Sequence, residues 1–234
     1  METELEVMIM KTEFWMLTIL LSAMMLNSGC IVHDQNTTLV INEDGSADMT
    51  ILRSNIRSTA SGDRANEQIA DFRAALNERT HDDFKRLRGA GATVEMSMWL
   101  REQVPMAHVL RASIPNRSSL EKMATLRDSE GAVVVDPDFS VNGTRRRLGF
   151  RISIDPESIS KPAAGGSGLE AFMEQRATAM SDIRICVSEG EISAASGFRI
   201  ADDGRSALFD EDKIKSLIQC GDGEAEIFIE WDVQ

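Results

Sequence analysis

The sequence predicts an α+β fold in which antiparallel strands outnumber helices. Short runs of β-prone residues recur along the chain, and turn signals separate them. One long segment, 63–88, instead repeats its apolar residues with the 3.6-residue period of an amphipathic helix. Runs of strands broken by only a few helices favour antiparallel sheets over the strict alternation of an α/β fold.

Two hairpins are predicted from the dipeptides Asp44-Gly45 and Asp203-Gly204. Each dipeptide lies between two strand-like runs. Asp-Gly favours a two-residue type I′ turn, because both central residues of that turn need a positive φ. The runs are 39–41 with 47–52, and 198–201 with 206–209.

The clearest helix is predicted over about 63–88. Its apolar side chains fall on one stripe, and the opposite face is charged. Ser61 or Asp63 can cap the beginning, and Gly89-Ala90-Gly91 ends the helix. The stripe consists of Ile69, Phe72, Leu76, Phe84 and Leu87.

The remaining elements follow from the same patterns. Clean alternation in 226–233 predicts a half-buried antiparallel strand. The Pro- and Gly-containing stretch 155–168 is expected to be a mobile loop or a subdomain boundary. The other expected strands are 93–100, 106–114, 132–135, 148–154 and 183–187. The other expected helices begin at Ser118 or Ser119, or cover 169–180 and 210–218.

The beginning of the chain has the pattern of an export signal. The apolar run 15–26 is too short to span a bilayer, but it fits the central region of a secretory signal. Ser28 and Gly29 then precede Cys30, and this arrangement resembles the signal of bacterial lipoproteins. The segment departs from that pattern at Asn27, where the family usually has Leu. The alternatives are an uncleaved N-terminal anchor or an ordinary buried helix.

The resemblance implies that Cys30 is lipidated and becomes the first residue of the mature chain. Residues 1–29 would be a signal peptide. Because the first residues are acidic, its true start is placed at Met10, next to a lysine, with Met8 as the alternative. Residues 30–37 are expected to be a lipidated tether, and 38–234 an extracytoplasmic domain. Ile31 stands where inner-membrane retention often uses Asp. In a diderm bacterium the implied location is therefore the periplasmic side of the outer membrane.

Charge and composition exclude some partners. Removal of residues 1–29 takes away four acidic residues and one lysine, which leaves 34 Asp and Glu against 24 Lys and Arg, a net charge of −10. Nucleic acid and anionic lipid headgroups both need a basic surface. Tyr is absent and only 5% of the residues are aromatic, so stacking platforms have few residues to build from. We expect no nucleic-acid partner.

Two cysteines remain once Cys30 carries lipid. An even pair in an exported chain predicts a disulfide between Cys186 and Cys220. Closing a loop of that size would contribute roughly 3–4 kcal/mol on the loop-entropy estimate. The alternative, a metal site, lacks nearby histidine ligands and C-x-x-C spacing.

The search for catalytic residues gives none, and no metal or cofactor is predicted. His33 lies in the expected tether, His108 in a strand, and His81 on the long helix as a solvated surface residue. No motif places two metal ligands on one helical face, and no G-x-S-x-G elbow supplies a nucleophile. Three carboxylate pairs, Glu43 with Asp44, Asp82 with Asp83 and Glu211 with Asp212, are adjacent in sequence, which usually places the two side chains on different sides of the backbone.

The order of lipidated Cys, strand, Asp-Gly turn, strand and long helix is similar to that of LppM-like periplasmic lipoprotein domains. The late run from Ile183 through the second Asp-Gly hairpin to 226–233 is also similar to the end of those domains. The resemblance implies an envelope-associated, non-catalytic domain that binds a lipid or a partner protein.

The function expected is therefore that of a membrane-anchored envelope lipoprotein, not an enzyme, with a binding or scaffolding role. The alternative is a lipid or hydrophobic-ligand carrier with an apolar pocket facing the Ile69–Leu87 stripe. A carboxylate-based hydrolase is the less favoured interpretation, because it would need converging acidic groups with displaced pKa values.

Overall fold

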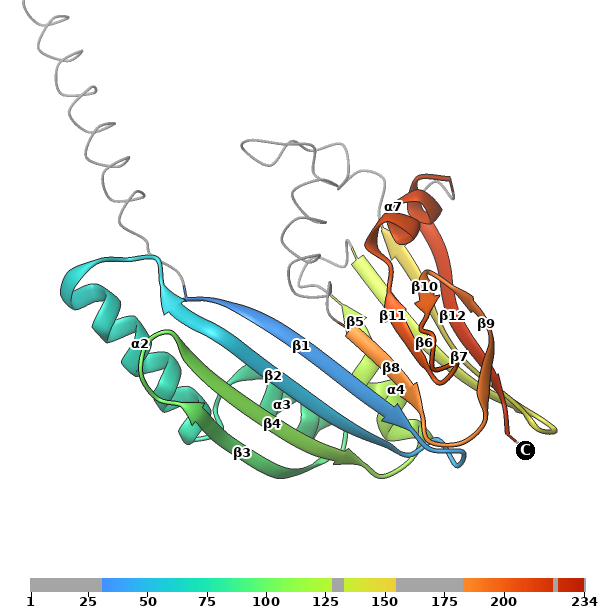
Figure 1. The fold of residues 1–234 in the computed structure, drawn as a ribbon, viewed down its shortest axis with the longest axis horizontal. Helices are drawn as coiled ribbons and strands as arrows, with labels where there is room; N and C mark the ends of the chain where they lie inside the picture. The colour runs from blue at the N-terminus through green and yellow to red at the C-terminus, as the bar shows by residue number, and fades with distance from the viewer. Residues whose placement is uncertain (1–30, 128–132, 155–182, 221–222, 234) are drawn as a thin grey trace, which may run out of the picture.

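The computed structural model describes residues 31–127, 133–154, 183–220 and 223–233. They form two sheets, shown in Figure 1. Sheet A has seven strands in the order β10-β11-β8-β1-β2-β4-β3. Its strands are β1 (Ile31–Ile41), β2 (Ala47–Ser58), β3 (Thr93–Arg101), β4 (Met106–Ile114), β8 (Ile183–Val187), β10 (Phe198–Ile200) and β11 (Ser206–Phe209).

Sheet B has five strands in the order β5-β6-β7-β12-β9. They are β5 (Leu126–Arg127), β6 (Val133–Asn142), β7 (Arg145–Ile154), β9 (Glu191–Ser196) and β12 (Glu224–Asp232). The final strand alternates as predicted, with Ile227, Ile229 and Trp231 buried.

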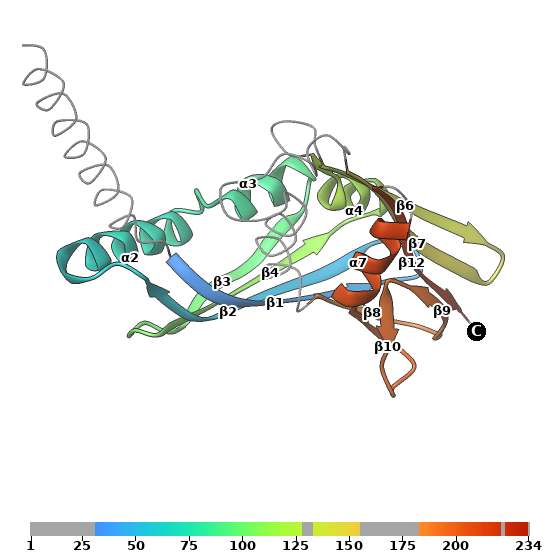
Figure 2. The ribbon, with the colours of Figure 1, turned by 90° about the horizontal axis from the view of Figure 1, so that it is seen from above.

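Four helices complete the described fold: α2 (Gly62–Asn77), α3 (Asp82–Gly89), α4 (Arg117–Ala124) and α7 (Glu211–Cys220). Figure 2 shows α2, α3 and α4 on one side of sheet A, and none of the helices of the described residues lies on the other side of β2, β4 and β3. The predicted α+β fold class is confirmed, and antiparallel pairing dominates.

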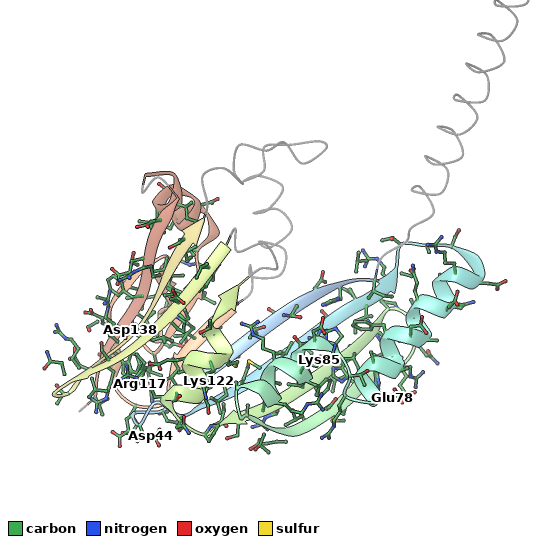
Figure 3. All side chains as sticks on the ribbon, turned by 180° about the vertical axis from the view of Figure 1, so that it is seen from behind. Asp44, Glu78, Lys85, Arg117, Lys122 and Asp138 are labelled. Carbon is green, nitrogen blue, oxygen red and sulfur yellow. The ribbon has the colours of Figure 1, made fainter. Side chains whose placement is uncertain are left out.

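One hydrophobic core joins the two sheets. It includes Ile41 and Leu110 of sheet A, Leu148 of sheet B and Leu76 of α2, all at most 1% exposed. Helix α4 packs against β6 of sheet B, where Arg117 Nη2 lies 3.8 Å from Asp138 Oδ1, and Figure 3 labels the two side chains close together. Its buried Leu120 belongs to the common core. The described strands and helices are therefore packed as one unit.

The predicted helix over 63–88 is present, and the structure divides it into α2 and α3. Arg79 adopts a left-handed backbone with φ +57°. The N–H of Thr80 then bonds to Ala75 O at 2.9 Å, and that of Arg79 to Leu76 O at 3.3 Å. These two bonds form a Schellman motif, which ends a helix through a left-handed residue. His81 follows as the N-cap of α3.

Both Asp-Gly hairpins are confirmed, but neither contains a type I′ turn. Gly45 and Gly204 have positive φ, whereas Asp44 and Asp203 do not. Instead, each Asp carboxylate accepts a hydrogen bond from a backbone N–H two residues later, at 2.9 Å in both turns. Because each loop is longer than two residues, the Asp side chain can accept a hydrogen bond from a backbone N–H of the turn, as in an Asx-turn.

Other details differ from the expectations. Residues 31–37, expected as tether, are the first part of β1, because their backbone pairs with β2 from Ile31↔Ser58 onward. Asn116 rather than a serine caps α4, since its side chain accepts from Ser119 N at 3.0 Å. The expected signal segment 1–29, the stretch 155–168 and the helix expected over 169–180 lie outside the described residues.

Candidate functional site

The three histidines of the chain come together around one buried arginine. Arg53 lies on β2 with 1% of its surface exposed. His108 on β4 is the cross-strand neighbour of Arg53, and Trp99 on β3 is the cross-strand neighbour of His108 on its other side. The charge of Arg53 helps to lower the pKa of both His33 and His81. The polar side chains of Arg53, His33, His81 and His108, from three strands and a helix cap, thus form one cluster, which we call the Arg53 cluster.

The junction between α2 and α3 supplies the partner of Arg53. The carboxylate of Asp83 accepts a hydrogen bond from Arg53 Nη2 and lies 3.1 Å from His81 Nδ1. The same Nδ1 accepts a 3.4 Å bond from the Asp83 backbone N–H. The adjacent Asp82 points outwards to Lys85, which Figure 3 labels on α3, at 2.8 Å. The two neighbouring carboxylates therefore have different environments.

Aromatic rings pack around the Arg53 cluster. The ring of Phe72 on α2 lies 5.9 Å from that of His33 and 5.5 Å, edge-on, from that of His81. The indole of Trp99 lies 5.0 Å from His108 and donates Nε1–H to Asn77 Oδ1 at 2.8 Å. These contacts attach α2 to β1 and β3, and they leave His33 and His81 half-buried and His108 buried.

Burial sets the charge state of the Arg53 cluster. It lowers the pKa of Arg53 to about 10, so the guanidinium remains charged at neutral pH. Burial first, and the charge of Arg53 second, lower the pKa of His108 to about 4. The same two causes lower the pKa of His33 and of His81. All three imidazoles are therefore mainly neutral at pH 7, and Asp83 is the carboxylate that balances Arg53.

The hydrogen bonding of the Arg53 cluster is incomplete. Arg53 Nε and Nη1, His33 Nδ1 and His108 Nδ1 are buried without a hydrogen-bond partner. A buried polar atom in this state costs the desolvation energy of the group. The cluster therefore depends strongly on the one ion pair that Arg53 makes with Asp83.

Ser97 and His108 have the spacing of a nucleophile and its base. Ser97 Oγ lies 3.0 Å from His108 Nε2. A catalytic histidine is normally held at its other nitrogen by a carboxylate, but His108 Nδ1 has no partner. A pKa of about 4 also makes His108 a weak base at neutral pH. The contact is suited to joining β3 to β4 and poorly suited to acyl transfer.

Three carboxyl groups in the described part of the chain have a pKa that is displaced downwards. Asp44, Asp82 and Asp203 have a lowered pKa, chiefly because each accepts a hydrogen bond from a nearby side chain. A carboxyl that acts as a general acid needs a raised pKa. Within the described part of the chain, no group of three or more His, Cys, Asp or Glu side chains could hold a metal ion.

The predicted lipidation and disulfide residues are only partly described. Cys30 lies outside the described residues. Cys186 is a free thiol on β8, on the opposite side from the buried Ile185 and Val187. Cys220 is the last residue of α7, and its side chain lies outside the described part, so the disulfide stays a prediction. In residues 31–127, 133–154, 183–220 and 223–233, no helix is long and apolar enough to cross a membrane.

The expected places of the histidines need two corrections. His33 is a β1 residue rather than part of a tether, and His81 is a half-buried helix cap rather than a solvated side chain. The two imidazoles are partly buried because β1 pairs with β2 and because the helix breaks before α3, where His81 is the N-cap. Arg53 was not identified from the sequence. Arg53 could have been identified, because every second residue of β2 is buried and Arg53 follows Ala47, Met49 and Ile51 in this alternation.

Comparisons with known proteins give a structural likeness at low similarity. No protein-family model matches the chain, and no curated protein matches it. The chain is similar to the folded domain of LppM from Mycobacterium tuberculosis, solved by NMR, with 12% identity and a TM-score of 0.35. The match covers 86% of this chain and 90% of that chain. The resemblance to LppM is thus present at low similarity, and a TM-score in this range does not establish a common fold.

Proposed function

We propose that this protein is an envelope lipoprotein whose lipid on Cys30 holds a non-catalytic binding or scaffolding domain at the membrane. The observation that carries the proposal is the position of β1. This strand begins at Ile31, the residue after Cys30. An acyl group on Cys30 would therefore be attached to the end of sheet A without a spacer.

The Arg53 cluster supports a non-catalytic role. Its ionised groups are paired with each other, its imidazoles are neutral, and His108 is too weak a base to activate Ser97 at neutral pH. The cluster attaches the α2–α3 junction to sheet A. A rigid platform of this kind is what a scaffold on the membrane surface requires.

The packing under the helices supports a scaffold over a carrier. Leu76, Phe84 and Leu87, from the predicted stripe, are each 1% exposed. They belong to the same hydrophobic cluster as the centre of sheet A, which includes Leu110. A carrier would need space between the stripe and the sheet for a lipid chain.

The test is the intact mass of the protein extracted from bacterial membranes, before and after reduction and alkylation of thiols. We expect a chain that begins at Cys30 and carries acyl groups, and Cys30→Ser should yield a chain without them. A wild-type chain without acyl mass that retains residues before Cys30 would overturn the anchor. The same spectra test the predicted disulfide: Cys186 and Cys220 would react only after reduction if it forms, whereas reaction of Cys186 before reduction would agree with the free thiol of the structure.

A further inference from the structure

The hairpin of β3 and β4 carries an unusual concentration of exposed apolar side chains. Among the described residues, five large apolar side chains are exposed, and three of them are Met98, Leu100 and Val104, at 46%, 55% and 56%. The other two, Val141 and Ile200, lie elsewhere in the fold. We call residues 98–104 the hairpin tip.

The hairpin tip lies at the end of sheet A from which the N-terminal segment leaves. Ile31 pairs with Ser58 at the end of β2, and Ile56 on the same strand pairs with Met106 at the start of β4. Figures 1 and 2 both show the start of β1, the end of β2 and the β3–β4 turn together at this end. Two strand spacings separate β1 from β4, so Ile31 and the turn are about 10 Å apart across the sheet.

The hairpin tip is attached to α2. Arg73 Nη2 donates a hydrogen bond to Glu102 and its guanidinium lies 5.9 Å from the Trp99 ring centroid. Trp99 is bonded in turn to Asn77. The one acidic residue of the tip is therefore paired, while Arg101 next to it is exposed. The tip thus presents apolar side chains and a cation, which suit the boundary between lipid tails and phosphate headgroups.

We propose that the hairpin tip inserts into the phospholipid surface to which the lipid on Cys30 is anchored. The inference rests on the proposed function, because the anchor brings this end of sheet A to the bilayer. A lipid on Cys30 alone fixes one point of the domain. A second contact by Met98, Leu100 and Val104 fixes its orientation, with β3 and β4 towards the membrane and the β6–β7 turn away from it.

The test compares two valines with nearly equal exposure at different places in the fold. Val104→Trp places an indole in the hairpin tip, and Val141→Trp, where Val141 is 53% exposed on β6, is the matched control. Each variant is the full chain, extracted from membranes and reconstituted into vesicles of phosphatidylethanolamine and phosphatidylglycerol. Quenching of tryptophan fluorescence by bromine-labelled phospholipids is measured. Far-UV circular dichroism checks that both variants are folded, and flotation checks that both are anchored.

The proposal expects bromolipid to quench V104W well beyond wild type and to leave V141W at the wild-type level. If the chain floats but V104W is quenched no more than V141W, the insertion is wrong and the anchor stands. The insertion is equally wrong if bromolipid does not quench the fluorescence of V104W and this fluorescence changes only when a second copy of the chain or another protein is added. If wild type does not float with the vesicles, the anchor itself is wrong and the insertion falls with it.

Discussion

Arg53 and His108 face each other across β2 and β4, and the charge of Arg53 helps to keep the imidazole of His108 neutral. Asp83 provides the compensating charge from the first turn of α3. The stability of this region therefore depends on which member of the cluster is removed and on the pH.

Removal of Asp83 should destabilise the protein more than removal of Arg53. Asp83→Ala leaves a guanidinium that is 1% exposed without a counter-charge, and we expect a loss of about 3 kcal/mol or more. Arg53→Met leaves a carboxylate that is 26% exposed and can still contact water, so a loss of about 1–2 kcal/mol is expected. Urea unfolding measures both. Equal losses, or a larger loss for Arg53→Met, would contradict the assigned burial.

The protein should lose stability as the pH falls from 7 to 5. In the unfolded chain a histidine titrates near its ordinary pKa of 6.5, whereas folded His108 titrates near 4. The unfolded chain therefore binds protons that the folded chain does not, and the free energy of unfolding decreases by about 2 kcal/mol from His108 alone. His33 and His81 act in the same direction.

The control for this pH dependence is His108→Gln, measured by urea unfolding at pH 7 and pH 5. The variant should lose much of the dependence. The carboxyl groups with lowered pKa contribute little at these pH values, since they ionise below 3.8 in the folded state. An unchanged dependence in H108Q would show that His108 is not the source.

Arg79→Gly should stabilise the protein by up to about 1 kcal/mol. Arg79 occupies the left-handed position that ends α2, where a side chain is strained and glycine is not. Its side chain is exposed, so little packing is lost. Thermal unfolding of R79G against wild type measures the gain. Arg79→Ala, which keeps the Cβ, should not show it.

Gly190→Ala should be among the most destabilising single changes in the described chain. Gly190 has φ +81°, and an added Cβ would lie 2.0 Å from the carbonyl oxygen of Asp232. We expect a loss of more than about 2 kcal/mol. Gly143→Ala is the matched control, because φ is +61° there but nothing lies within 4 Å, and about 1 kcal/mol is expected. Similar losses for both would argue against the close approach of β12 to the β8–β9 turn.

The hairpins and most helices could be predicted because their signals are local. Asp-Gly turns, alternation and helical period each depend on neighbouring residues, and these elements were found. The parallel pairing of β1 with β8 was not foreseen. It joins Thr37–Ile41 to Ile183–Val187, and nothing near either strand specifies its distant neighbour. The break at Arg79 was also missed, because no glycine marks the left-handed residue.

The candidate site was harder to predict, because its residues meet only in the folded chain. His33, His81 and His108 have no regular spacing, so a motif search finds nothing. The one local signal was Arg53, a charge at a position where the alternation of β2 predicts an apolar side chain. A charged residue in a buried phase requires a partner, and that requirement, rather than any motif, marks the site.

The parallel ladder between β1 and β8 also determines when the domain can be completed. The part of the chain synthesised first can build β1, β2, β4 and β3 from the β1–β2 and β3–β4 hairpins and the β2–β4 pairing, with one edge of β1 still open. That edge is closed only after the segment around residue 185 has been synthesised. Long-range pairings of this kind form slowly, and open edges recruit other strands. A half-synthesised chain would therefore be the species most in need of a chaperone.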